Sequence, residues 1–331
     1  MGKASRTKQD GDRRARIAAQ REAERRAAQR KRIYLAGGSI LVVAIVVVAF
    51  VLVKLNSGGG TAAASSNGPT GAALAAVTKQ VENVPTSVTD KVAGGGVQSG
   101  LFTSGETTTD ISKASSQLGS YFATVNSSTP LTSGGKPEVL YIGSEYCPFC
   151  AAQRWAMVNA LSRFGTFTGL TTTHSSSTDS YPNTPTYTFY KSTYKSNYID
   201  FTSVEENTNY RIGNTTNTSV GYQPLQTPTA AQQALATTYD PGNGSGSPIP
   251  FIDLGNKYVQ VGNLSPLSPA LLAGKTWSQV AAAMADPTSA IGKAEIGNAN
   301  YMTAGICKLT NNQPAAACTP AIQKLETAFA S

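Results

Sequence analysis

The sequence predicts a mixed α/β domain that follows one transmembrane helix, and three observations support this prediction. A stretch of twenty residues, 34–53, contains no charged side chain. Only 14% of the 331 residues are charged, whereas soluble domains average about 25%. From Lys136 onward, segments with strand character alternate with segments that have helical spacing of apolar residues. Such alternation is typical of the α/β class.

The positive charge of the chain is confined to its N-terminus. Residues 1–33 contain 12 Lys and Arg against 4 Asp and Glu, and the difference, 12 − 4 = +8, equals the net charge of the whole chain. A nucleic-acid-binding domain distributes basic side chains over a folded surface, so we expect no nucleic-acid partner for the domain. We predict a cytoplasmic basic tail that is attracted to the lipid bilayer. A cytoplasmic RNA or protein partner of the tail is the alternative.

The uncharged stretch predicts a transmembrane helix at 34–54. Twenty residues at about 1.5 Å each cross a hydrocarbon layer about 30 Å thick. A cleaved signal peptide is the alternative, but its apolar region usually has only about 7 to 15 residues. Because Lys and Arg stay on the cytoplasmic side, we expect a single-pass protein of the cell membrane with a cytoplasmic N-terminus and an extracytoplasmic C-terminal domain.

Composition divides the remaining chain into a linker and one domain. Residues 55–71 are rich in Gly, Ser and Ala, which is typical of a flexible linker. Residues 72–331 form the predicted domain, with its core at about 136–285, a helical or loop insertion, and C-terminal helices. Apolar residues at helical spacing predict a first helix at 72–84 and, after Pro85, a short second one.

The core of the domain begins with a strand and a helix. The apolar run Glu138–Gly143, EVLYIG, predicts a buried strand, and a helical pattern that ends near Gly165 follows it. β-rich runs at 186–190 and 198–202 predict one hairpin, and Gly255-Asn256 between two apolar runs predicts another. Further helical patterns occupy 230–239, 277–285, 290–309 and 320–330.

Cys147 and Cys150 lie between the predicted strand and the helix, in the sequence Cys-Pro-Phe-Cys. At a helix N-terminus, unpaired N–H groups and the helix dipole favour a thiolate over a thiol. The pKa of such a cysteine can fall from about 8.5 to between about 3.5 and 7.5. We therefore predict that Cys147 is the nucleophile of thiol–disulfide exchange and that Cys150 resolves the mixed disulfide. Pro148 at the first helical position costs no hydrogen bond.

Other interpretations of the motif compete with redox activity. A c-type haem site needs His directly after the second cysteine, where Ala151 stands. Zinc needs four ligands, but Cys307 and Cys318 enclose ten residues and His174 is not at ligand spacing. We therefore expect neither a metal nor an organic cofactor. A purely structural disulfide between Cys147 and Cys150 remains open.

The motif and its surroundings resemble the thioredoxin superfamily. That superfamily places its redox Cys-x-x-Cys after a central strand and opposes it with a cis-proline, and Ile249-Pro250 before FIDLG stands at that position. The resemblance implies a thioredoxin-like three-layer α/β/α domain and a substrate-binding role for Ile249, Pro250, Pro148 and Phe149. Strongly oxidising members often have His where Phe149 stands, so we expect no extreme oxidant; the direction of electron transfer stays open.

Three longer segments give a closer resemblance: EVLYIGSEYCPFCAAQRWAMVNALSRFGTF, THSSSTDSYPNTPTYTF and ICKLTNNQPAAAC. They are similar to an uncharacterised family of membrane-anchored archaeal and actinobacterial proteins, a domain-of-unknown-function family. The resemblance covers about residues 74–318. It implies a thioredoxin-like domain and brings no established substrate.

Glu145 and the second cysteine pair complete the candidate residues. Glu145 precedes the motif by two residues and is a possible proton relay; a solvent-facing charge at the strand end is the alternative. Outside the cytosol, Cys307 and Cys318 are expected to form a structural disulfide that ties the last helix to the domain. A second, electron-shuttling pair is the alternative.

These residues together predict a membrane-tethered thiol–disulfide oxidoreductase. Its partners would be thiols and disulfides of exported proteins and an unidentified membrane redox partner that recycles the motif. The alternative is a non-catalytic cell-surface binding or assembly module that uses the same scaffold and only structural disulfides.

Overall fold

The structure is a computed structural model of the chain. It describes residues 68–92, 122–125, 127–239, 249–262 and 267–329. The predicted basic tail, the transmembrane helix and the linker up to residue 67 lie outside the described residues. Among the helices within them, none is long and apolar enough to cross a membrane.

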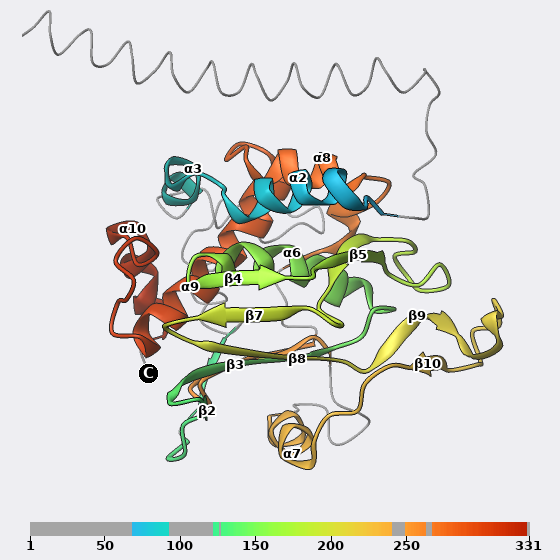
Figure 1. Cartoon of the computed structure of the whole chain (residues 1–331), viewed down its shortest axis with the longest axis horizontal. Helices are drawn as coiled ribbons and strands as arrows, with labels where there is room; N and C mark the ends of the chain where they lie inside the picture. The colour runs from blue at the N-terminus through green and yellow to red at the C-terminus, as the bar shows by residue number, and fades with distance from the viewer. Residues whose placement is uncertain (1–67, 93–121, 126, 240–248, 263–266, 330–331) are drawn as a thin grey trace, which may run out of the picture. The chain divides into compact units, whose positions relative to one another are not determined.

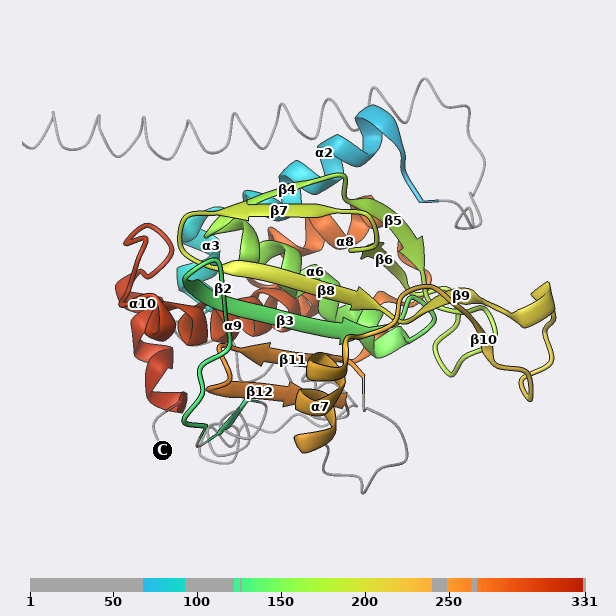
Figure 2. The same ribbon diagram turned by 60° about the horizontal axis from the view of Figure 1, so that its bottom comes forward.

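A mixed sheet lies at the centre of the domain (Figures 1 and 2). Its central strand is β3 (Lys136–Gly143), which confirms the predicted strand. On one side, β3 pairs in parallel with β8 (Asp200–Glu205), and on the other it pairs antiparallel with β11 (Phe251–Leu254). The sheet continues with β12 (Tyr258–Val261) and β1 (Ala123–Thr124), while β2 (Thr132–Ser133) pairs with the first residues of β3.

The hairpin predicted around Gly255-Asn256 is confirmed. Strands β11 and β12 pair antiparallel, and the two turn residues have φ angles of 65° and 54°. Glycine and asparagine tolerate these left-handed angles better than other residues, which explains the dipeptide. The carboxylate of Asp253 accepts a hydrogen bond from the Asn256 N–H at 2.6 Å and closes the turn.

Helices cover both faces of the sheet (Figure 2). Val139 and Tyr141 of β3 join a large apolar cluster with the helices of one face, whereas Leu140 and Ile142 join a smaller cluster on the other. The alternation follows from the twofold repeat of a strand. The longer helices of the large cluster are α2 (Gly71–Glu82), α6 (Pro148–Ser162), α8 (Trp277–Met284) and α9 (Gly297–Leu309), and the helix of the small cluster is α7 (Ala230–Thr238).

The packed core is wider than the predicted 136–285. Val77 and Val81 of α2 are buried in the large cluster, and so is nearly the whole of α9. The last part of the predicted linker also contacts the domain, because the Thr172 hydroxyl donates to the Pro69 carbonyl at 3.0 Å. The remaining helical elements are α3 (Thr86–Lys91), η2 (Ile212–Asn214), η4 (Pro269–Leu272), η5 (Gly292–Ile296), α10 (Pro320–Gln323) and η6 (Lys324–Phe329).

The hairpin predicted between 186–190 and 198–202 is wrong. Each run instead pairs with a different part of the chain. Residues 185–188 pair with residues 171–174, and the six residues of β8, with the buried Val204, pair with β3 in parallel register. Gly165 does not cap α6 either, because it begins a strand. The insertion, which was predicted to be helical or loop, consists largely of strands. Three two-stranded sheets form there: β4 (Gly165–Thr168) with β7 (Thr193–Ser196), β5 (Thr171–His174) with β6 (Pro185–Thr188), and β9 (Asn207–Arg211) with β10 (Tyr222–Pro224).

Candidate functional site

The Cys-Pro-Phe-Cys motif occupies the predicted position between strand and helix. Strand β3 ends at Gly143, Cys147 is the N-cap residue of α6, and Pro148 is its first helical residue. The backbone N–H of Cys150 donates to the Sγ atom of Cys147 at 3.3 Å. The sulfur therefore takes the place that a capping oxygen has at other helix N-termini, where a negative charge is stabilised.

The two cysteines are free thiols in different surroundings. Cys147 is 6% exposed, whereas Cys150 is fully buried. A hydrogen bond from the Cys150 thiol, together with the backbone N–H groups of the helix and the charge of Arg154, holds the pKa of Cys147 below its ordinary value against the opposing effect of burial. Burial raises the pKa of Cys150 well above its ordinary value. The arrangement therefore favours a thiolate on Cys147 and a neutral thiol on Cys150.

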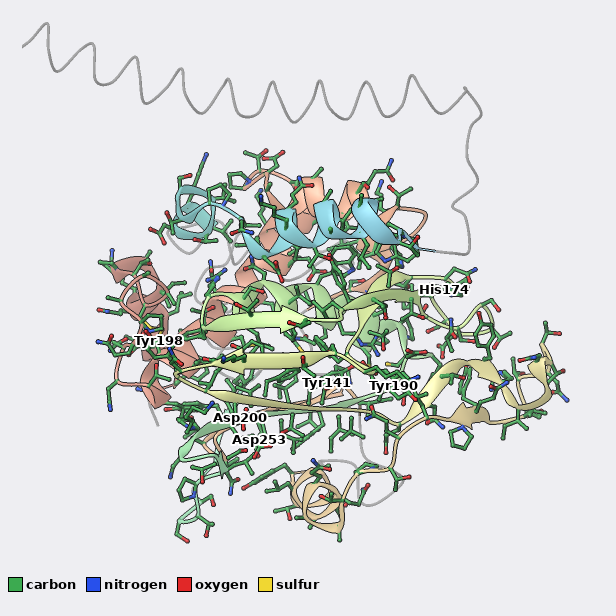
Figure 3. The ribbon with its side chains drawn as sticks, viewed as in Figure 1. Tyr141, His174, Tyr190, Tyr198, Asp200 and Asp253 are labelled. Carbon is green, nitrogen blue, oxygen red and sulfur yellow. A yellow bond between two sulfur atoms is a disulfide. The ribbon has the colours of Figure 1, made fainter. Side chains whose placement is uncertain are left out.

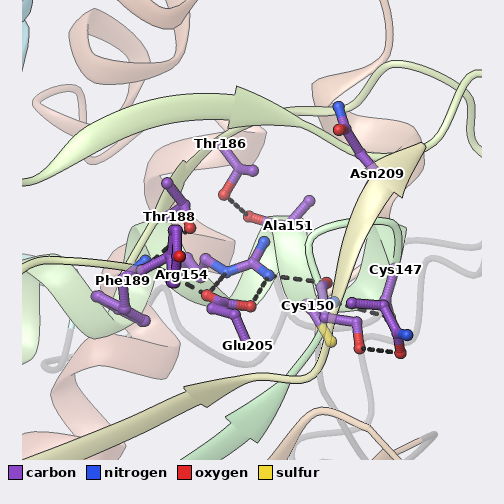
Figure 4. A network of polar contacts seen from close by, with 12 residues as sticks. Cys147, Cys150, Ala151, Arg154, Thr186, Thr188, Phe189, Glu205 and Asn209 are labelled. Carbon is purple, nitrogen blue, oxygen red and sulfur yellow. Dashed lines mark hydrogen bonds and ion pairs between the residues drawn. The ribbon is translucent and has the colours of Figure 1, made fainter. Parts of the chain in front are cut away.

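A buried ion pair lies one helical turn beyond Cys150 (Figure 4). The guanidinium of Arg154 donates from Nε and Nη2 to the two carboxylate oxygens of Glu205, at 2.8 and 2.6 Å, and both side chains are fully buried. Burial alone would lower the pKa of Arg154, but Glu205 outweighs it and raises the pKa well above its ordinary value. Arg154 is therefore a permanent positive charge inside the domain.

The ion pair was missed by the sequence interpretation. Arg154 and Glu205 are 51 residues apart and belong to different elements, α6 and β8. The available signal was an arginine inside an otherwise uncharged helix, since Arg154 is the one charged residue in the run 146–162. The signal did not identify its partner, because the parallel pairing of β8 with β3 was not predicted.

Tyr141 lies beside the ion pair, near the middle of the sheet in Figure 3. The guanidinium carbon of Arg154 is 5.8 Å from the centre of its ring. The Tyr141 hydroxyl is buried and has no hydrogen-bond partner among the described residues. A side chain on Gly143 would collide with this hydroxyl, so glycine at the end of β3 leaves room for the tyrosine.

Glu145 is buried rather than solvent-facing, which contradicts the alternative of a surface charge. It is 9% exposed, and its backbone N–H donates to the Asn207 carbonyl at 2.9 Å. Burial raises the pKa of its carboxyl group, while the Thr188 hydroxyl and the charge of Arg154 partly oppose the shift. A carboxyl group with a raised pKa can exchange protons with a thiol within its reach, and Glu145 precedes Cys147 by two residues in the chain.

The predicted cis peptide bond is present between Ile249 and Pro250. Because β11 is antiparallel to β3 and Phe251 lies opposite Ile142, Pro250 lies at the end of the sheet from which the motif follows. The Pro250 carbonyl accepts from the Gly262 N–H at 2.8 Å, and proline has no N–H of its own. Of the two residues, Ile249 therefore has more backbone hydrogen-bonding capacity.

Aromatic side chains surround the motif. Phe149 is 36% exposed and contacts Tyr181 edge to face, with ring centres 5.9 Å apart. Tyr146 stacks on Tyr222 of β10 at 3.9 Å, and Arg211 lies over the Tyr222 ring, 4.1 Å from its centre. The arm formed by β9 and β10 is thus joined to the loop that carries the motif.

His174 lies in a strand. It ends β5, is half-buried, and accepts through its carbonyl from the Asn209 side chain at 3.1 Å (Figure 3). Within the ranges that the structure describes, no group of three or more His, Cys, Asp and Glu side chains could hold a metal ion.

Cys307 and Cys318 form the expected disulfide, and both are buried. The bond lies near the end of the sheet opposite the motif, because Leu309 packs against Gly255, whose N–H donates to the Glu138 carbonyl at the start of β3. From Glu138 to Gly143 the strand extends over roughly 17 Å, at about 3.3 Å per residue. This separation speaks against direct electron exchange between the two cysteine pairs.

Comparison with known proteins yields one match. No curated protein and no solved structure matches the chain significantly. A family model described as "Domain of unknown function (DUF929)" matches residues 121–308, more than half of the chain and including β3, the motif, α6 and the hairpin of β11 and β12. The chain therefore belongs to the DUF929 family.

Proposed function

We propose that the protein is a membrane-tethered thiol–disulfide oxidoreductase of exported proteins. The observation that carries the proposal is the contrast between the two thiols: Cys147 caps α6 with its sulfur and has a lowered pKa, while Cys150 is fully buried with a raised pKa. A structural disulfide has no need of this difference, whereas a nucleophile and a resolving thiol do.

The proposal includes a thioredoxin-like fold. In its support, the strand that precedes the motif is flanked by a parallel strand and an antiparallel hairpin, with helices on both faces. The cis bond before Pro250 lies at the same end of the sheet as the motif. Both features agree with the position of the motif in that superfamily.

The reaction proceeds by two exchanges of sulfur bonds. The Cys147 thiolate attacks one sulfur of a substrate disulfide, the S–S bond breaks, and the departing substrate thiolate takes up a proton. Cys150 then loses its proton and attacks Cys147 Sγ, which releases the second substrate thiol. Two electrons pass to the substrate, and the motif becomes a disulfide. In the reverse direction, substrate thiols reduce the motif and become a disulfide.

Neighbouring groups have defined parts in these steps. Glu145, with its raised pKa, accepts the proton that Cys150 must lose before its attack. Ile249 and the exposed ring of Phe149 hold the substrate chain beside Cys147. A redox partner in the membrane returns the motif to its starting state, and the tail at 1–33 with the span at 34–54 keeps the domain near that partner.

A non-catalytic binding module on the same scaffold is the second candidate. The burial of both cysteines favours it, since Cys147, at 6% exposed, offers little surface to a substrate.

Single cysteine variants distinguish the two candidates. The full chain with Cys150→Ser is mixed with a disulfide-bonded model peptide, and the adduct is measured by mass spectrometry. The proposal requires a stable mixed disulfide on Cys147 in this variant and none in the matched variant Cys147→Ser. Loss of thermal stability in both variants without any adduct would leave the binding module as the better account.

A further inference from the structure

Arg154 connects three parts of the site. It lies four residues after Cys150 on α6, so both side chains share one face of the helix. Its guanidinium binds both carboxylate oxygens of Glu205 at the end of β8, and Nη2 also donates to the Ser144 carbonyl at 2.8 Å. The same carbonyl accepts from the Cys147 N–H at 3.2 Å. The Arg154 guanidinium and the Cys147 N–H thus donate to the same carbonyl oxygen in the loop before the helix.

Different neighbours hold the two side chains of the ion pair in place. The carboxylate of Glu205 accepts from the Phe189 N–H at 3.3 Å, and Phe189 lies on the other side of the ion pair from the two cysteines (Figure 4). Arg154 contacts the loop that carries the motif through its hydrogen bond to the Ser144 carbonyl. The other titratable groups around the guanidinium are Tyr141, whose ring it faces, and Glu145.

A role in stability alone does not explain the pair well. Removing two opposite charges from water is costly, and apolar residues of similar size often stabilise a protein as much or more. Arg154 also keeps one amino group, Nη1, without a hydrogen-bond partner among the described residues. Its charge lowers the pKa of both Cys147 and Cys150.

We propose that Arg154, held in place by Glu205, is a positioning residue that fixes the loop carrying Cys147 and sets the reduction potential of the motif through its buried positive charge. The inference rests on the proposed redox function. A positive charge stabilises the thiolate and therefore the reduced motif, which makes the motif disulfide more oxidising. Glu205 limits this effect by balancing the charge.

Charge variants of the two residues test this inference in opposite directions. In the full chain, Arg154→Met is expected to raise the pKa of Cys147 by about one unit. It should also shift the equilibrium with glutathione about tenfold toward the motif disulfide, which corresponds to a potential about 30 mV more negative. Glu205→Gln leaves the guanidinium unbalanced, so the pKa should fall and the potential should rise. Thiolate absorbance and glutathione equilibration measure the two quantities.

Arg163→Met is the matched control. Arg163 is a half-buried arginine at the C-terminal end of α6, where it binds Asn159 and Asn300 far from the motif. This variant should lower thermal stability without moving the Cys147 pKa. If Arg154→Met and Glu205→Gln shift the pKa in the same direction as each other, or leave it unchanged in folded protein, the inference is wrong.

If a single variant does not fold, the double variant Arg154→Met/Glu205→Gln tests the inference. It is expected to fold because it leaves no buried charge of the ion pair without its partner. Its Cys147 pKa must lie above that of the unchanged protein, and an equal or lower pKa contradicts the inference. A failure of the proposed function is distinguishable: the motif of the unchanged protein would then stay a disulfide in all the glutathione buffers.

Discussion

The backbone N–H of Cys150 donates to the Sγ atom of Cys147 at 3.3 Å, so the first cysteine of the motif caps its own helix. This hydrogen bond strengthens when the sulfur is ionised, because a charged acceptor is a stronger acceptor than a neutral one. The hydrogen bond that caps the helix therefore also stabilises the thiolate form of Cys147 relative to its thiol form.

The first prediction concerns the ionisation of Cys147. Its alkylation rate should rise with pH around a midpoint below about 8.5, the pKa of a free cysteine. Cys150→Ala removes the thiol hydrogen bond that lowers this pKa most, so the midpoint should move upward. The measurement is the pH dependence of modification by iodoacetamide, followed by peptide mass spectrometry. A midpoint that is the same in both proteins would count against the assigned role of Cys150.

The second prediction concerns Asp253, whose pKa is raised by burial from 3.8 to about 7. The unfolded chain releases this proton near pH 4, whereas the folded domain keeps it until about pH 7. The unfolded state is thus favoured progressively between these values, and stability should fall as pH rises from about 4 to 7. Asp253→Asn should flatten this decline, because an amide does not titrate.

Thermal unfolding at several pH values tests the Asp253 prediction. The control is Asp286→Asn, because Asp286 is exposed and its pKa is lowered by the Thr288 hydroxyl. Asp286→Asn should show the same fall in stability as the unchanged protein when the pH rises from about 4 to 7. Equal pH profiles for the unchanged protein and Asp253→Asn would show that another group is responsible.

The third prediction concerns Gly143 and Tyr141. Gly143→Ala places a methyl group on the buried tyrosine hydroxyl and should destabilise the domain by about 1–3 kcal/mol, as overpacking usually does. Tyr141→Phe removes a hydroxyl that has no partner among the described residues, so it should cost little or nothing. The double variant should recover only part of the loss, as measured by denaturant unfolding, because the added methyl group also collides with the ring carbon Cζ, which phenylalanine keeps. An additive loss in the double variant would mean that the two groups do not collide.

The fourth prediction concerns the disulfide between Cys307 and Cys318. Replacing both cysteines with Ala should lower the free energy of unfolding by about 2–3 kcal/mol, the value expected for a loop of this length. The reactivity of Cys147 toward a model disulfide should not change, since the two pairs lie at opposite ends of β3. A loss of that reactivity in folded protein would support the alternative of an electron-shuttling pair.

The local part of the site could be predicted from the sequence. The run EVLYIG, the motif and the uncharged helix after it are adjacent in the chain, and short-range periodicity identifies each of them. The turn at Gly255-Asn256 also depends only on neighbouring residues. The cis bond before Pro250 came from resemblance, not from periodicity.

The long-range part could not be predicted in the same way. The partner of β3 on its parallel side is β8, and α6 together with the strands β4 to β7 lies between them in the chain. Without that pairing, nothing in the sequence joins Arg154 to Glu205. Nor does periodicity reveal that α9 is buried on nearly all sides, since its polar residues, such as Asn298 and Asn300, make their hydrogen bonds inside the core.

The reduction potential of the Cys147–Cys150 pair tests the central claim most directly. The full chain is equilibrated in glutathione buffers of graded ratio, and the fraction of oxidised motif is read from alkylation of the free thiols. A redox-active motif is expected to give a potential between about −270 and −120 mV, the range of known thiol–disulfide oxidoreductases. A potential below about −300 mV, typical of structural disulfides, would contradict the account.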